Sequence, residues 1–121
     1  LQVLKTTLIA KAEKLGALPF VKAVVENCSA EDLKQLSALL LGELKECAII
    51  LASAFDGKAN VLAAASKNAQ TAGFNAGNVI KELTTALDGR GGGKPDFAQG
   101  SGKAVEKLAS TIASYGVKVS A

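Results

Sequence analysis

A run of residues from Gly89 to Gly102 combines the residue types best suited to binding an anion. Glycine lets the backbone approach a ligand closely and adopt positive φ. The glycines of the run are Gly89, Gly91, Gly92, Gly93, Gly100 and Gly102. Arg90 and Lys94 lie within the run and Lys103 follows it, which adds a guanidinium and two ammonium groups to the free backbone N–H groups. These groups together predict a phosphate-binding segment.

Two other interpretations fit this run less well. A flexible linker would be richer in serine and would lack Phe97 and the fixed φ of Pro95. A nucleotide-binding P-loop needs a glycine, four residues and then Gly-Lys-Ser/Thr, placed after a strand. Here Gly93-Lys94 is followed by proline, and Asp88 stands at the upstream glycine position. The run therefore differs from both patterns.

Catalytic machinery is excluded by the residues that the chain lacks. There is no histidine, so Ser-His-Asp and Cys-His nucleophiles and the commonest general base near neutral pH are missing. Cys28 and Cys47 have no CxxC spacing and are too few for a structural zinc site, so we expect two reduced thiols. Neighbouring carboxylates such as Glu31 and Asp32 are expected at a helix start. We therefore predict no catalytic residue, no metal ligand and no cofactor in this chain, which by itself is not expected to be an enzyme.

Positive charge is concentrated in the second half of the chain. Residues 1–56 contain six basic and seven acidic side chains, whereas residues 57–121 contain eight basic and four acidic ones. The net charge of +3 thus comes from the half with the glycine-rich run, as expected for an anionic partner such as nucleic acid. Gln99 could then reach a base edge or a 2′-hydroxyl, while Phe97 is expected to anchor the run to the core.

The length and composition indicate a single domain. With 121 residues, of which 49% are hydrophobic, the chain can bury a core of small aliphatic side chains. No apolar run approaches the ~20 residues that span a bilayer, and no targeting segment opens the chain. We therefore expect no membrane partner and a cytoplasmic location, with an organellar matrix left open.

The elements before the glycine-rich run begin with a helix over residues 3–15, where apolar residues recur at three- and four-residue steps. Because the chain opens within this pattern, residues 1–16 are expected to continue an upstream helical region, and residues 17–121 to form the globular domain. Residues 20–25 form a β-branched run typical of a strand. Ser29 and Asp32 then form a shortened capping box for a second helix.

A hairpin and two further helices complete the predicted fold. Asp56-Gly57 between apolar runs predicts a type I′ turn that joins strands 48–55 and 58–65. Ile49-Ile50-Leu51 lacks polar alternation, so this strand should be buried on both faces. Asn75 is expected to cap a third helix that ends at Gly89 in the left-handed conformation.

The last helix is expected over residues 103–114, directly after a glycine-rich loop, with a short edge strand over residues 117–119. The fold class is α/β (α+β): a small mixed β-sheet with a central hairpin, covered by about four helices.

The sequence from Leu87 to Gly102 resembles the C-terminal signature of alanyl-tRNA synthetases. The match runs through Gly-Arg-Gly-Gly-Gly, Pro-Asp, Ala-Gln and Gly-x-Gly. In that family the signature closes the DHH-associated domain, also called the C-terminal alanine domain. The Gly-Phe-Asn-Ala-Gly segment from Gly73 to Gly77, the hairpin before it and the final helix are similar too. The resemblance therefore covers most of the chain apart from the first helix.

The resemblance implies a non-catalytic tRNA-binding module of an alanine–tRNA ligase. Such a module contacts the tRNA elbow and helps the aminoacylation and editing sites to share one tRNA. Its implied partners are alanine-specific tRNA, the other domains of the parent synthetase and, in some members, a second copy. ATP and zinc are implied only for the other domains of the parent. The candidate tRNA-binding residues are Arg90, Lys94, Gln99 and Lys103. Many relatives carry arginine in place of Lys94, and lysine lacks the bidentate fork of arginine.

Three other parents or roles stay open. The chain could be the C-terminal, substrate-binding part of a DHH-type phosphoesterase, although that class typically has a histidine in or near the glycine motif. It could belong to a free-standing alanyl-tRNA editing protein, although Pro-Asp-Phe-Ala-Gln favours the synthetase. A plain dimerisation module is the third alternative.

Overall fold

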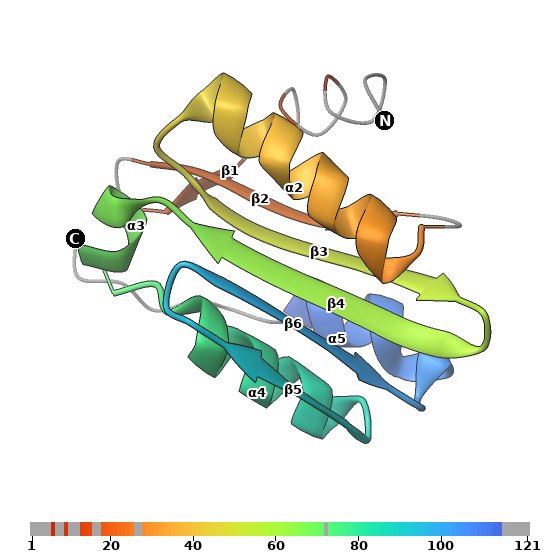
Figure 1. Ribbon diagram of the computed structural model, residues 1–121. Helices are drawn as coiled ribbons and strands as arrows, with labels where there is room; N and C mark the ends of the chain where they lie inside the picture. Colours follow the sequence, from red (N-terminus) through yellow and green to blue (C-terminus); the bar gives the residue numbers. More distant parts are fainter. Residues whose placement is uncertain are drawn as a thin grey trace.

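A six-stranded mixed sheet organises the chain in the computed structural model, which describes residues 6, 9, 13–15, 18–25, 28–71 and 73–114 (Figure 1). The strand order is β1-β2-β3-β4-β6-β5. The strands are β1 (Glu13–Leu15), β2 (Leu18–Val24), β3 (Ala48–Phe55), β4 (Lys58–Ala65), β5 (Gly89–Gly93) and β6 (Phe97–Gly102). Only β2 and β3 pair in parallel, and the other pairs are antiparallel. The predicted mixed sheet with covering helices is confirmed.

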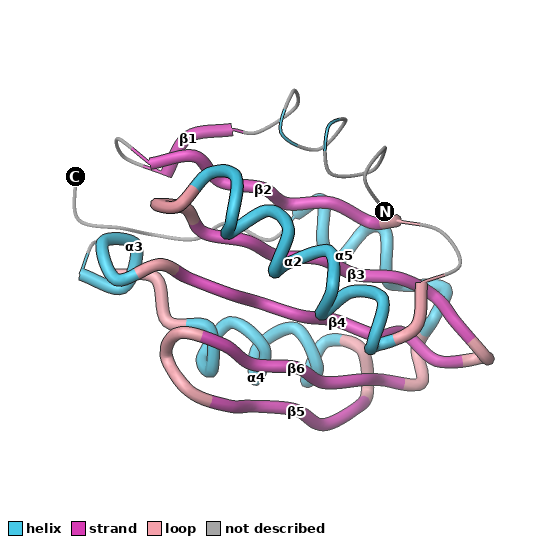
Figure 2. The backbone as a smooth tube through the Cα atoms, turned by 45° about the horizontal axis from the view of Figure 1, so that its top comes forward, coloured by secondary structure: helices cyan, strands magenta, loops and turns pink. Residues whose placement is uncertain are grey.

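Helices cover both faces of this sheet. They are α2 (Ala30–Leu44), α3 (Lys67–Thr71), α4 (Ala76–Ala86) and α5 (Leu108–Ser114), with a 3₁₀ turn η1 (Val105–Lys107) before α5. Leu33, Leu36 and Leu40 of α2 form an apolar cluster on one face of the sheet. Helices α4 and α5 lie on the opposite face (Figures 1 and 2), and their apolar residues form a second cluster there. The sheet is therefore the middle layer of three.

The strand β3 is buried on both faces, as its unbroken apolar run predicts. Ile50 belongs to the cluster under α4 and α5, whereas Ile49 and Leu51 belong to the cluster under α2. All three side chains are fully buried. Because β2 and β3 are parallel, their connection must cross over the sheet, and α2 is that crossover.

The predicted turn and helix caps are also confirmed. Asp56 and Gly57 both have positive φ, 53° and 73°, and join β3 to β4 in the expected register. The Ser29 hydroxyl accepts from the Asp32 amide at 3.2 Å, and the Asp32 carboxylate accepts from the Ser29 amide at 3.1 Å. The side chain of Asn75 accepts from the Asn78 amide at 3.1 Å at the start of α4.

The prediction of a helix over residues 3–15 is wrong at its C-terminal end. Residues Glu13–Leu15 form β1, which pairs antiparallel with β2. Backbone pairing with the edge of β2 satisfies their hydrogen bonds, so tertiary context overrides the helical periodicity. Thr6 and Ile9 are helical, and the other residues of the predicted helix lie outside the described residues, as do residues 117–119. The division between residues 1–16 and 17–121 stays a prediction.

Two predicted helix boundaries are also wrong. The left-handed residue after α4 is Asp88, with φ 57°, whereas Gly89 is the first residue of β5. Aspartate tolerates this conformation better than most residues. The final helix begins at the 3₁₀ turn Val105–Lys107 and continues as α5, so Lys103 precedes it instead of opening it.

Candidate nucleic-acid interface

The glycine-rich run is a β-hairpin, so its prediction as a loop is wrong. Strands β5 and β6 pair antiparallel from Gly89↔Gly102 to Gly93↔Ala98. Small residues alternate along both strands and face α4: Gly89, Gly91, Gly93, Ala98, Gly100 and Gly102. This period of two was a sequence signal for strands.

Close packing against α4 explains the glycines that face it. A Cβ atom at Gly91 would lie 2.7 Å from Cγ2 of Ile80. A Cβ atom at Gly100 would lie 2.6 Å from Cγ2 of Thr84. Helix α4 therefore packs directly on the backbone of the hairpin, as glycine in a strand often permits.

The turn of this hairpin is fixed by backbone hydrogen bonds. The Lys94 amide donates to the Phe97 carbonyl at 2.9 Å, which closes the turn around Pro95 and Asp96. The Ala76 amide at the start of α4 donates to the Pro95 carbonyl at 3.0 Å, and the Ala65 amide at the end of β4 donates to the Asp96 carbonyl at 2.9 Å. The hairpin is thus attached to both its neighbouring helix and its neighbouring strand.

On the opposite face, no helix among the described residues packs along β5 or β6, although the start of α2 reaches Gln99 of β6. Helix α2 lies over β3 and β4, and β5 and β6 lie beyond it (Figures 1 and 2). Arg90 of β5, Ser101 of β6 and Asn60 of β4 form a polar row across three strands on this face, because Asn60 pairs with Ser101 and Ser101 pairs with Arg90. The sheet thus presents a polar surface beside α2.

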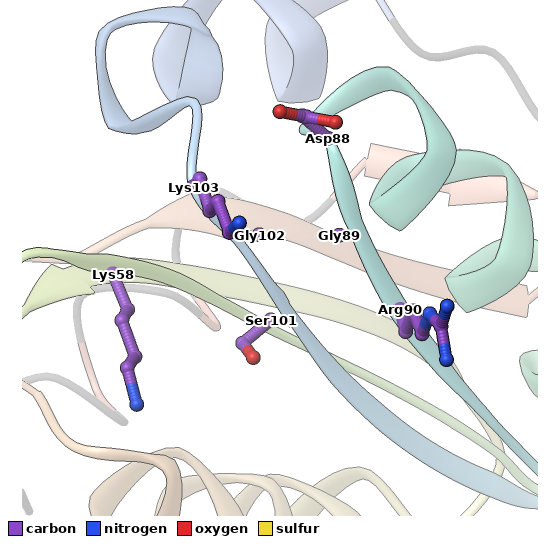
Figure 3. Close-up of a pocket in the computed structure, with 7 residues that line it drawn as sticks. All are labelled: Lys58, Asp88, Gly89, Arg90, Ser101, Gly102 and Lys103. Atoms are coloured by element: carbon purple, nitrogen blue, oxygen red, sulfur yellow. The ribbon is translucent and has the colours of Figure 1, made fainter.

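A basic pocket of about 420 Å³ lies at one end of this surface. It is lined by Lys58, Asp88, Gly89, Arg90, Ser101, Gly102 and Lys103. Figure 3 shows Asp88 and Lys103 together where β5 begins and β6 ends, with Arg90, Ser101 and Lys58 on the three strands. Lys58, Arg90 and Lys103 are exposed, and within the described part of the chain none of them forms an ion pair. We call this the basic pocket.

The predicted site residues divide between the two ends of the hairpin. Arg90 and Lys103 line the basic pocket. Lys94 and Gln99 line a second, shallower depression at the turn. Lys94 is the fourth residue after Arg90, which corresponds to about 13 Å of extended chain. The Gln99 amide nitrogen donates to the Ala30 carbonyl at 3.2 Å, so it links β6 to the start of α2.

Phe97 is half-buried and packs against the apolar cluster under α2. This agrees with its predicted role as an anchor of the hairpin.

Sequence reasoning missed four residues of this surface. Lys58 and Ser101 reach the basic pocket because β4 pairs with β6, and Asp88 is its one acidic lining residue. Phe55, the register partner of Lys58, is a large apolar side chain that is 41% exposed. The pairing of β4 with β6 joins segments far apart in the sequence, so no local pattern could reveal it.

The cysteines are poorly suited to nucleophilic chemistry. Cys28 and Cys47 are buried free thiols. Burial, and then the negative charge of Glu46, raises the pKa of Cys47 to about 11. Burial, followed by the charge of Asp32, also raises the pKa of Cys28. Since the thiolate is the reactive form, neither side chain is activated.

Metal binding and membrane insertion find no support in the described residues. No three His, Cys, Asp or Glu side chains within those residues are grouped so that they could hold a metal ion. No helix in the same part of the chain is long and apolar enough to cross a membrane.

The DHHA1 domain family model matches residues 18–116. Together with the mixed sheet and its glycine hairpin, this match shows that the chain belongs to the DHHA1 domain family. Within that family the chain is a relative of the C-Ala domain of alanyl-tRNA synthetase. The crystal structure of that domain from Aquifex aeolicus superposes with a TM-score of 0.73 at 32% identity, over 84% of this chain and 91% of that one.

The curated relatives include two alanine–tRNA ligases of similar identity. This chain is 41% identical over 106 residues to the alanine–tRNA ligase of Thermoanaerobacter sp. (strain X514). It is 39% identical over 105 residues to the alanine–tRNA ligase of Opitutus terrae. These alignments cover 88% and 87% of this chain but only 12% and 11% of the relatives. A DHH-domain member of the s1p family of ribosomal proteins shares the fold, with a TM-score of 0.58 at 14% identity, over 99% of this chain and 31% of that one.

Proposed function

We propose that this chain is the tRNA-binding module of an alanyl-tRNA synthetase and that the tRNA contacts the uncovered face of β5 and β6 at the basic pocket. The observation that carries the proposal is the meeting of Lys58, Arg90 and Lys103 at one pocket, on an exposed face and without an ion pair among the described residues. Unpaired surface cations of this kind bind phosphates with little loss of existing interactions.

The uncovered face is suited to a folded RNA. A row of short polar side chains between the cations leaves room for an RNA backbone, and Ser101 can donate to a phosphate oxygen. Lys94 lies about 13 Å from Arg90 along extended backbone, and Gln99 pairs with Gly92 between them. A backbone that runs along β5 would therefore pass all three side chains. A surface of this kind reads shape more than sequence, as recognition of the tRNA elbow requires.

The proposal includes the wider role of the module. By holding the elbow, the chain would keep one tRNA available to both the aminoacylation and the editing sites of its parent. ATP and zinc would bind in other domains of that parent, and this chain would contribute no catalytic residue. Its partners would be alanine-specific tRNA and those domains, with a homodimer in addition, in a cytoplasmic or organellar-matrix enzyme.

Salt-dependent binding of a tRNA transcript tests the proposal. Arg90→Ala, Lys58→Ala and Lys103→Ala should each weaken binding by about 1–3 kcal/mol, because each removes a charge-assisted phosphate contact. Each should also reduce the slope of log K against log salt by about 0.7–0.9. In the same assay, Lys94→Ala tests whether the RNA contacts the turn end of the hairpin. A loss of affinity similar to that of Arg90→Ala would extend the interface along β5.

Lys67→Ala is the matched control, because Lys67 is an exposed lysine of α3 outside the pocket. It should leave the affinity and the salt slope unchanged. If the three pocket variants bind the transcript as tightly as the wild type with the same salt slope, the RNA surface lies elsewhere. An unstructured RNA of equal length should bind more weakly than the folded transcript.

A further inference from the structure

We infer that Asp88 accepts a hydrogen bond from a ribose 2′-hydroxyl in the basic pocket, so that this site selects RNA over 2′-substituted or deoxy backbones. The inference rests on the proposed function, since it specifies what the same pocket recognises. It starts from the composition of the pocket, in which one exposed carboxylate stands among three exposed cations.

The backbone fixes the position of Asp88 from both sides. Its amide donates to the Thr85 carbonyl at 3.3 Å, and its carbonyl accepts from the Lys103 amide at 3.4 Å. Asp88 therefore lies at the end of the pocket where Lys103 leaves β6, as Figure 3 shows. Among the described residues it forms no ion pair with Lys103 or any other cation.

A carboxylate in this position favours a particular part of a nucleotide. An ionised aspartate is an acceptor only and repels a phosphate, so it opposes the binding of an anion without a donor group. The ribose hydroxyl is the donor that lies next to every phosphate in RNA, and it distinguishes RNA from DNA. A pocket of about 420 Å³ is within the range of small-ligand sites, roughly 300–1,000 Å³. The cations are thus placed to hold a phosphate and Asp88 the neighbouring sugar.

The backbone conformation of Asp88 supplies a structural alternative that can be tested separately. Its φ of 57° lies in the left-handed region, which asparagine and glycine adopt at least as readily as aspartate. Asp88→Asn keeps the size and the conformation but removes the charge. Asp88→Gly keeps the conformation and removes the acceptor. If Asp88 were present for its conformation alone, neither change would alter the choice of nucleic acid.

The experiment compares two probes: an alanine tRNA transcript and the same transcript made with 2′-fluoro riboses, which lack the hydroxyl donor. The wild-type chain should bind the first about tenfold more tightly, the effect of one hydrogen bond to a charged group. Asp88→Gly should bring the two dissociation constants within about twofold of each other, and Asp88→Asn should give an intermediate ratio because its neutral oxygen is a weaker acceptor.

Asp96→Asn is the matched control, because Asp96 is an exposed aspartate at the other end of the hairpin and its loss changes the net charge equally. It should keep the wild-type ratio. A ratio that is the same in the wild type, Asp88→Gly and Asp96→Asn would overturn the inference while the binding of the transcript itself upholds the proposed function. Absence of binding of the transcript by the wild type would overturn both.

Discussion

At Gly91 the missing side chain determines how closely two elements pack. The position of its would-be Cβ is 2.7 Å from Ile80 of α4 and 2.6 Å from Cα of Gly100 on β6. Gly92, the next residue, pairs with Gln99 on the other face of the hairpin. The nearest atom to its Cβ would be Cε of Lys81, a long α4 side chain, at 3.9 Å. Two adjacent glycines thus have different structural roles.

Gly91→Ala should lower the free energy of unfolding by about 1–3 kcal/mol, because α4 or β6 must move to admit the methyl group. Gly92→Ala should leave it unchanged or raise it by up to about 1 kcal/mol, since alanine loses less conformational entropy on folding. Chemical denaturation of both variants beside the wild type measures the difference. Equal losses at the two positions would contradict the close packing of α4 on β5.

The residues proposed to bind an anion were only partly found from the sequence. Arg90 and Lys103 were recognised by their charge near glycines, and they meet in the basic pocket. Lys94 has the same charge but lies at the turn, because extended backbone separates it from Arg90. Residue type indicated which side chains could bind an anion, whereas the strand conformation decided which of them are neighbours.

Among the elements, β3 supports the rest of the sheet. It lies between β2 and β4, and its side chains enter both apolar clusters. The basic pocket depends on it indirectly, since β4 carries Lys58 and pairs with β3 along its whole length. Damage to β3 is therefore expected to affect the whole fold.

Ile50→Ala should lower the free energy of unfolding by about 2–5 kcal/mol, because it leaves a cavity in the cluster under α4 and α5. Ile50→Val removes one methylene group and should cost about 0.5–1.5 kcal/mol. Thermal or chemical unfolding of both variants should therefore show a larger loss for Ile50→Ala than for Ile50→Val. A loss below about 1 kcal/mol for Ile50→Ala would contradict the full burial of this strand.

The alanine–tRNA ligases to which this chain is related are much longer than the chain itself. The chain spans about 12% of the length of a curated relative that it matches. It has no histidine, and its buried thiols are held in the neutral form. The proposed tRNA-binding role therefore predicts binding without turnover for the isolated chain.

The isolated chain should therefore show no turnover in three assays: aminoacylation with alanine, ATP and tRNA, deacylation of mischarged tRNA, and hydrolysis of short oligonucleotides with Mn²⁺. The physical reason is that the sequence has no histidine and that its two described thiols have raised pKa values. The parent synthetase serves as the positive control for the first assay. Turnover that survives repurification in any assay would contradict the prediction.

Several local features of the chain, and its family, follow from the sequence alone. Asp56-Gly57, Ser29 with Asp32, and Asn75 each specify a turn or a cap through their own backbone and side-chain chemistry, and the unbroken apolar run of β3 specifies burial on both faces. The motif from Leu87 to Gly102 identified the family because its residue order is specific. Each of these signals is contained in a short stretch of the chain.

Tertiary interactions make the glycine-rich run a hairpin and bring Arg90 and Lys103 to the same pocket as Lys58. Glycine has a low intrinsic preference for strands, so local propensity indicated a loop. Packing of α4 on the bare backbone and pairing of β6 with β4 determine the conformation instead. Both interactions join segments far apart in the chain, and their energies depend on neighbours that the local sequence does not contain.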